Sequence, residues 1–372
     1  MMSAMAAYKF LGRSGLKVSN ICLGTMTFGQ SLGFSGFSTP TQCDEETAHA
    51  ILNRYAELGG NFIDTANIYS AGKCEEIIGN WLQSKQRDNF VIATKVRFKM
   101  DNSNVNKVGL SRRHIIESCE ESLSRLQTSY IDLYQTHNWD CGVPLEETLR
   151  TLDDLVRCGK IRYFGMSNLC GWQMQKVVDL TKSLGLNNVT SLQQQYSLLC
   201  RQSEWEEFMV CREEGIGVLP WSPLKGGVLT GKFDRHKKPD PERSRIGYVN
   251  SIEGKVKGYQ STPDWHLYVE DDNYWKLVET MRKIASSHGK TVPQVALRWL
   301  LQKDIVVSAI CGATSVHQIE ENMGASSGWE LSQDQMKVLD DASPKYWYYP
   351  YNVIWKTDQA ERVNHFLNKS ML

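Results

Sequence analysis

The sequence has no excess of charge of either sign, because 42 Lys and Arg residues balance 42 Asp and Glu residues. A net charge near zero provides no overall field that would attract nucleic acid or an anionic membrane. The chain also lacks any apolar run of the ~20 residues that cross a bilayer, and its start, MMSAMAAYKF, lacks the basic flank and apolar core of a secretion signal. We therefore expect a cytoplasmic protein that binds neither nucleic acid nor membranes.

The ten cysteines include no CxxC pair and no Cys/His cluster with the spacing of a metal site. Cysteines scattered in this way are typical of reduced thiols in the cytosol, so we expect neither a disulfide framework nor a bound metal. The last three residues, Ser-Met-Leu, resemble the peroxisomal address Ser-Lys-Leu but lack its basic middle residue. A peroxisomal location is therefore the less favoured alternative.

Eight short apolar runs alternate with helical segments, and no GxGxxG motif follows any run to suggest a Rossmann crevice. The runs are 21–24, 61–65, 90–94, 131–137, 162–168, 189–193, 217–222 and 306–312. Helical segments such as 44–60 and 145–160 carry a single apolar stripe, as helices that cover a sheet from outside do. This α/β pattern predicts a (β/α)₈ TIM barrel, with residues 1–372 in one domain. A turn at 13–15 predicts a β-hairpin before the first run.

Two segments break this alternation. About 85 residues separate the seventh run from the eighth, and the part 232–270 is polar and rich in Gly and Pro. It predicts a long loop after strand seven, and long loops in compact domains are usually functional or disordered. The tail, 344–372, begins with an aromatic stretch that either closes a pocket or covers the outside of the barrel.

Polar residues lie at the carboxyl ends of the second, third and fourth runs: Asp64, Lys95 and His137, with Tyr69 five residues beyond Asp64. The carboxyl ends of parallel barrel strands open onto one face, so these side chains can meet there. A phenol has an ordinary pKa of about 10, and a neighbouring ammonium favours the phenolate and lowers that pKa. We expect Lys95, held by Asp64, to lower the pKa of Tyr69 in this way. Tyr69 would then donate a proton to a substrate oxygen that His137 orients.

Each of these residues also has a simpler interpretation. A strand-end ion pair accounts for Asp64 and Lys95, a packed phenol for Tyr69, and a satisfied core histidine for His137. The four together at successive strand ends favour a catalytic site.

The motifs around these residues resemble those of the aldo-keto reductases. The motifs are LGTMTFG (23–29), FIDTANIYSAGKCEEIIG (62–79), ATK (93–95), YQTH (134–137) and QIEENMGA (318–325). The resemblance covers most of the chain and is to the branch that contains bacterial aldo-keto reductases and the potassium-channel β subunits. It assigns the catalytic roles to Asp64, Tyr69, Lys95 and His137.

This resemblance implies NADPH-dependent reduction of an aldehyde or ketone to an alcohol, with hydride from nicotinamide and Tyr69 as the acid. The alternative is an NADP-binding regulatory subunit like the channel β subunits. Those subunits carry asparagine where this chain has His137, which favours the reductase.

The resemblance also places contacts with NADPH or NADP⁺. Ser167, Asn168 and Gln193 would hold the nicotinamide carboxamide, although the run of three glutamines leaves a shift of one residue open. Trp221 would stack on the ring, with an ordinary core tryptophan as the alternative. The other expected contacts are Thr25, Met26 and Asp64 near the ring, Ser222, Leu224 and Gly226 on the pyrophosphate, and Gly312, Thr314, Gln318, Glu321 and Asn322 on the adenosine half.

Many members of the family carry arginine where this chain has Gln318. Glutamine has no charge to offer a phosphate, so we expect Lys232 and Arg245 in the long loop to bind the 2′-phosphate instead, unless they are only solvated loop charges. Tyr69, His137, Trp139 and Phe98 would contact a small carbonyl substrate. The sequence identifies neither that substrate nor the oligomeric state.

Overall fold

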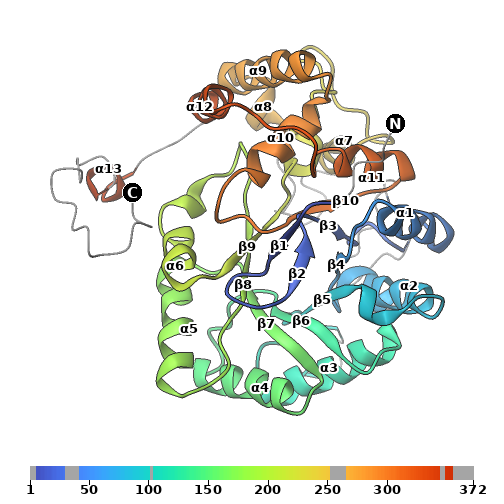
Figure 1. Ribbon diagram of the computed structural model, residues 1–372, viewed down its shortest axis with the longest axis vertical. Coiled ribbons are helices and arrows are strands. Elements are labelled where there is room, and N and C mark those ends of the chain that lie inside the picture. Colours follow the sequence, from blue (N-terminus) through green and yellow to red (C-terminus); the bar gives the residue numbers. More distant parts are fainter. Residues whose placement is uncertain (1–5, 30–41, 101–103, 252–264, 344–347, 355–372) are drawn as a thin grey trace.

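The computed structural model describes residues 6–29, 42–100, 104–251, 265–343 and 348–354. Eight parallel strands close into a barrel in the order β10-β3-β4-β5-β6-β7-β8-β9, with helices outside it (Figure 1). The strands are β3 (Ile21–Gly24), β4 (Phe62–Asp64), β5 (Val91–Val96), β6 (Ile131–Thr136), β7 (Ile161–Ser167), β8 (Ser191–Gln195), β9 (Gly217–Trp221) and β10 (Ala309–Gly312). Each overlaps one of the eight predicted runs, which confirms the predicted (β/α)₈ TIM barrel.

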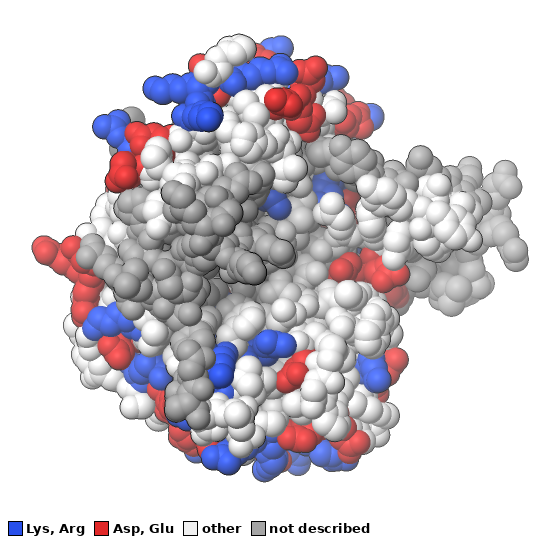
Figure 2. Space-filling model, turned by 180° about the vertical axis from the view of Figure 1, so that it is seen from behind, with Lys and Arg blue, Asp and Glu red and all other residues white. Residues whose placement is uncertain are grey.

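The predicted hairpin is also confirmed, as β1 (Tyr8–Phe10) pairs with β2 (Lys17–Ser19) in antiparallel fashion. Two residues of this hairpin, Leu11 and Val18, are fully buried. They pack with interior residues of the barrel such as Phe62 and Leu133. The hairpin therefore closes the amino ends of the strands and lies across the barrel in Figure 1. Figure 2 shows the opposite face, where the strands end, and Lys and Arg side chains lie around its middle as well as at its edge.

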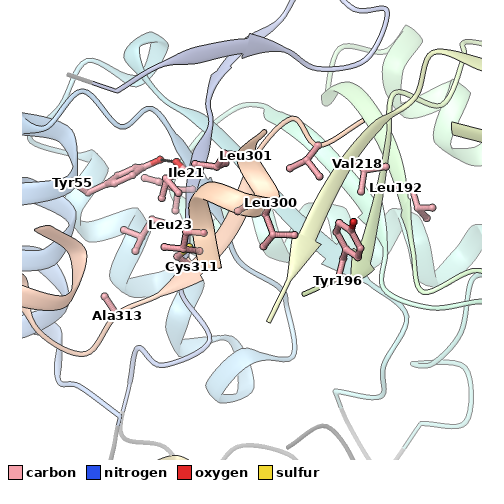
Figure 3. Close-up of a cluster of buried hydrophobic side chains, with 14 of the residues drawn as sticks. Ile21, Leu23, Tyr55, Leu192, Tyr196, Val218, Leu300, Leu301, Cys311 and Ala313 are labelled. Atoms are coloured by element: carbon pink, nitrogen blue, oxygen red, sulfur yellow. Dashed lines mark hydrogen bonds between the residues drawn. The ribbon is translucent and has the colours of Figure 1, made fainter. Parts of the chain in front are cut away.

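The helices that cover the barrel bury one apolar face each. They are α1 (Glu45–Glu57), α2 (Lys73–Leu82), α3 (Arg112–Leu126), α4 (Leu145–Arg157), α5 (Gly171–Ser183), α6 (Glu207–Glu214), α10 (Val292–Leu301) and α11 (Val316–Met323). In α1, for example, Asp44 accepts a hydrogen bond from the Thr47 backbone and caps the helix. The hydroxyl of the buried Tyr55 of α1 lies 2.7 Å from the Ile21 carbonyl (Figure 3) and 2.8 Å from the Phe62 carbonyl, and its one hydrogen bonded to either of them joins the helix to the barrel wall.

The long segment before β10 contains two short helices that we did not expect, α7 (Arg245–Ser251) and α8 (His266–Val269). The longer α9 (Asp272–His288) follows them, and α12 (Gln333–Ala342) follows α11. The described parts of 232–270 therefore include two short helices, whereas 252–264 lie outside the described residues. Isolated apolar side chains anchor this segment, because Ile246 and Trp265 are buried and Trp265 packs against Phe233 at 5.1 Å. Single anchors in a polar stretch give no periodic pattern, so the sequence did not indicate these helices.

Of the tail, the structure describes residues 348–354, with α13 at Tyr351–Ile354. Tyr351 stacks on Trp205 at 5.0 Å and donates a hydrogen bond to Glu206. These contacts place α13 against the outside of the molecule near α6, as Figure 1 shows. None of the helices in the described part of the chain combines the length and the apolarity that a bilayer crossing requires.

Candidate active site

A buried ion pair lies at the carboxyl ends of β4 and β5. Asp64 is the last residue of β4, and Lys95 lies in β5 one strand away. The Lys95 Nζ lies 2.5 Å from the Asp64 Oδ1, and the two side chains are 0% and 2% exposed. A charge pair removed from water in this way is stable only when its remaining hydrogen-bonding groups are also satisfied.

The Lys95 ammonium satisfies all three of its hydrogens. Besides Asp64, it donates to the Thr65 carbonyl at 2.8 Å and to the Tyr69 hydroxyl at 3.3 Å. Tyr69 is half-buried and opens the 3₁₀ turn η1 (Tyr69–Gly72), which follows β4. Because its oxygen accepts from the ammonium, its own hydrogen remains available to a group in the mouth of the barrel.

Two glutamines hold the other oxygen of Asp64. Gln193 in β8 donates to the Asp64 Oδ2 at 2.8 Å, and Gln135 in β6 donates to the same oxygen at 3.1 Å. Thr25 donates to the Asp64 carbonyl through both its backbone and its hydroxyl. Gln135 is a residue of the site that we did not predict from the sequence. It lies two residues before His137, and strand alternation on β6 could have indicated that it faces the barrel interior.

The pKa of Tyr69 shifts in the direction opposite to our expectation. Burial raises the pKa of Tyr69, and this effect outweighs the lowering by the Lys95 ammonium. Burial alone would lower the pKa of Lys95, but the charges of Asp64 and Tyr69 and its hydrogen bonds to both raise it. The expectation of a lowered tyrosine pKa was therefore wrong, because it counted the charge and omitted desolvation. The result is a protonated tyrosine beside a protonated lysine.

His137 follows β6 and lies beside Tyr69, with ring centroids 5.8 Å apart. Its backbone joins the neighbouring strands, since its N–H donates to the Val96 carbonyl and its carbonyl accepts from the Asn168 side chain. Burial, Lys95 and Arg97 together hold the pKa of His137 well below its usual range. The imidazole is therefore neutral near pH 7 and can donate a single N–H. Its Nδ1 is buried and has no hydrogen-bond partner in the described structure.

The predicted nicotinamide contacts gather at the ends of β7 and β9. The Trp221 indole donates to the Asn168 Oδ1 at 3.0 Å, and both residues line a cavity of about 330 Å³. Asn168 has a positive φ of 58°, which turns the chain sharply after β7. The Ser167 hydroxyl is buried and has no partner among the described residues. A buried orphan hydroxyl needs a hydrogen-bonding group from outside the chain, and a carboxamide would supply one.

A strained turn follows β9, where the sequence predicts the pyrophosphate. Ser222 and Lys225 have positive φ values of 51° and 50°, and the following Gly226 and Gly227 also lie in the left-handed region. Such turns aim consecutive backbone N–H groups into a concave surface that suits an anion. Leu224 is the N-cap residue of the helical turn η4 (Lys225–Thr230).

Of the two predicted phosphate-binding cations, Lys232 lies near this turn. A Cβ placed on Gly227 would lie 3.8 Å from the Lys232 Nζ. Within the described ranges no carboxylate pairs with Lys232, which is exposed. Arg245 is half-buried and is the first residue of α7. These positions agree with the expected roles but do not test them.

The residues predicted to contact the adenosine half meet at the end of β10 and the start of α11. The Gln318 side-chain carbonyl accepts from the Thr314 backbone at 2.8 Å, and Asn322 donates to the Gly312 carbonyl at 3.4 Å. Glu321 is half-buried in α11, one residue before Asn322. Gln318 therefore closes the turn before its own helix, and its exposed amide carries no charge for a phosphate.

The predicted substrate contacts line the mouth. Phe98 packs edge-on against His137 at 4.8 Å, and Trp139 packs against Trp172 at 5.7 Å. Met26 is 40% exposed, beside the buried Thr25.

Fold and site together define a TIM-barrel protein whose buried ion pair presents a tyrosine hydroxyl at the open face. A model described as "Aldo/keto reductase family" matches residues 20–344. The chain belongs to this family.

Three relatives show how varied the named members are. An aldo-keto reductase of Fusarium vanettenii is 33% identical, over 90% of each chain. A norsolorinic acid reductase of Aspergillus flavus is 31% identical over 94% of this chain and 84% of its own. An Arabidopsis thaliana protein named "Probable voltage-gated potassium channel subunit beta" is 33% identical over 86% of this chain and 90% of its own. The family and the reductase names support an oxidoreductase.

We predict that His137 stays neutral in the folded protein down to a pH well below 6.5. NMR titration of the histidine ring signals, with His137→Gln to assign the resonance, should show no inflection near pH 6.5 for this residue. The unfolded chain binds a proton there whereas the native state does not, so His137 should reduce folding stability as pH falls below about 6.5. An inflection between about pH 6 and 7 would contradict the proposed environment.

Proposed function

We propose that the protein reduces an aldehyde or ketone to an alcohol with NADPH, and that Tyr69 donates the proton. The observation that carries this proposal is the position of the Tyr69 hydroxyl, which accepts a hydrogen bond from the buried Lys95 ammonium at 3.3 Å. In that arrangement the phenol can only donate toward the mouth. A developing alkoxide is stabilised most by donors placed before the reaction begins.

The chain offers a cradle that fits the cofactor. The orphan Ser167 hydroxyl would bind the carboxamide, Trp221 would lie against the ring, and the turn from Ser222 to Gly227 would receive the pyrophosphate. When bound there, NADPH supplies the hydride. A regulatory subunit would bind the cofactor through the same residues. The relative named as a channel β subunit supports this alternative.

The residues of the chain do the remaining work. Neutral His137 donates its N–H to the substrate oxygen and orients the carbonyl. Tyr69 then passes its proton to that oxygen as negative charge develops there. The phenolate that remains is held by Lys95, whose position the Asp64 carboxylate fixes. The raised pKa of Tyr69 keeps its phenol protonated before the reaction. After proton transfer the Lys95 ammonium stabilises the phenolate.

Tyr69→Phe should reduce turnover of 4-nitrobenzaldehyde by ~10²–10⁴-fold, the usual contribution of a general acid, because it removes the proton donor and keeps the ring. NADPH oxidation gives the rate, and fluorescence titration should show nearly unchanged NADPH affinity. Tyr8→Phe, on the hairpin at the closed end of the barrel, is the matched control and should retain activity. A Tyr69→Phe variant with more than about half of wild-type activity would refute the assignment. Tight NADPH binding by the wild type, with no turnover of a broad carbonyl panel, would favour the regulatory subunit.

We also propose that NADPH is preferred to NADH through Lys232 and Arg245. A hydrogen bond to a charged group contributes roughly 1.5–3 kcal/mol, so Lys232→Ala or Arg245→Ala should weaken NADPH binding about ten- to a hundred-fold and scarcely change NADH binding. Calorimetric dissociation constants for both cofactors test this, with Arg243→Ala as the control because its side chain is 87% exposed. An equal loss of affinity for both cofactors would mean that the substituted residue contacts a part that NADPH and NADH share, and not the 2′-phosphate.

A further inference from the structure

Arg97 is a cation at the wall of the active site to which the sequence assigns no role. It follows the last residue of β5 and is half-buried. Arg97 lies two residues beyond Lys95, just past the carboxyl end of β5 and therefore on the open side of the barrel. Its charge reaches the site, because it contributes to lowering the pKa of His137.

The Arg97 guanidinium is fixed in place but carries no counter-charge. Its Nε donates to the Trp139 carbonyl at 3.3 Å, and its central carbon lies 5.5 Å from the Phe98 ring centroid. Among the described residues no carboxylate oxygen comes within 4.0 Å of it. Asp140, which lies on the neighbouring loop, uses its two oxygens for the backbones of Leu110 and Gly142.

Other arginines that are largely buried in this protein behave differently. Arg87 pairs with Asp132 at 2.6 Å, Arg125 with Glu75 at 2.8 Å, and Arg201 with Glu204 at 2.8 Å. A half-buried guanidinium is partly desolvated, so a carboxylate usually accompanies it. The two terminal nitrogens of Arg97 have no hydrogen-bond partner among the described residues and remain available to a ligand.

We infer that Arg97 binds a carboxylate carried by the carbonyl substrate itself. This inference rests on the proposed function. Two residues of extended backbone span roughly 6.4–6.8 Å, so the anionic group would lie about one benzene ring outward from the level of Lys95. The Phe98 ring lies against the guanidinium, and the Trp139 ring packs on Trp172 at the same mouth, so the connecting part of the substrate would be flat and apolar. The substrate class is therefore an aromatic or similarly extended oxo acid, with the carbonyl innermost.

A matched pair of aldehydes tests this inference. 4-Carboxybenzaldehyde carries the anion, and methyl 4-formylbenzoate is its neutral ester. The measured quantity is the ratio of kcat/KM for the acid to kcat/KM for the ester, which cancels any general damage to the site. Arg97→Met should lower this ratio ten- to a hundred-fold, and Arg97→Lys should restore part of it because it keeps the charge. Lys99→Met, which removes a nearby half-buried cation, is the control and should change the ratio less than about threefold.

Two results would overturn the inference. One is a ratio in Arg97→Met within about twofold of the wild type, and the other is an equal fall in Lys99→Met, which would indicate a general field. If the wild type reduces neither aldehyde, the proposed function fails, and calorimetry with 4-methylbenzoate and 4-methylbenzamide then tests the carboxylate site without turnover. Wild type should bind the benzoate more tightly, and Arg97→Met should lose that difference. Equal binding of the two compounds by the wild type would overturn the carboxylate site independently.

Discussion

The ion pair between Asp64 and Lys95 is the interaction on which the rest of the site depends. Neither side chain reaches solvent, so each charge needs the other, and removing one partner of such a pair usually costs about 3–5 kcal/mol. The barrel meets this requirement at the strand ends, where Gln135, Gln193 and Thr65 supply the remaining hydrogen bonds. The Lys95 ammonium uses two of its hydrogens on Asp64 and Thr65. The third hydrogen is donated to the Tyr69 oxygen.

Burial and the Lys95 charge oppose each other at Tyr69 and act in the same direction at His137. Desolvation raises the pKa of Tyr69 and lowers that of His137, whereas the Lys95 charge lowers both. The tyrosine consequently stays protonated and the histidine stays neutral, so two neutral donors face the mouth beside a fixed positive charge. This arrangement suits a reaction in which negative charge appears on a substrate oxygen. Arg97 places a second positive charge beyond Lys95, toward the open side of the barrel. An anionic substrate would interact with this charge, and a neutral one would not.

The sequence predicts the barrel and the four strand-end residues because apolar periodicity and strand order are local properties with one consistent solution. It does not predict quantities that depend on three-dimensional enclosure. The direction of the Tyr69 pKa is one example, since the neighbouring lysine is visible in the sequence and the burial is not. Gln135 and Arg97 are others, because a glutamine or arginine near a strand end is ordinary until its partners are known. The helices in 232–270 depend on isolated apolar anchors, which give no pattern. The assigned cofactor contacts remain predictions.

Hydride transfer to a carbonyl separates an enzyme of this family from a subunit that only binds the cofactor. The most direct measurement uses NADPH deuterated at both C4 positions, with 4-nitrobenzaldehyde and the wild-type protein, followed by mass spectrometry of the alcohol. Hydride transfer from the cofactor should place one deuterium on the carbinol carbon of every product molecule. Alcohol without deuterium, or bound NADPH that is never consumed by any carbonyl compound, would contradict it.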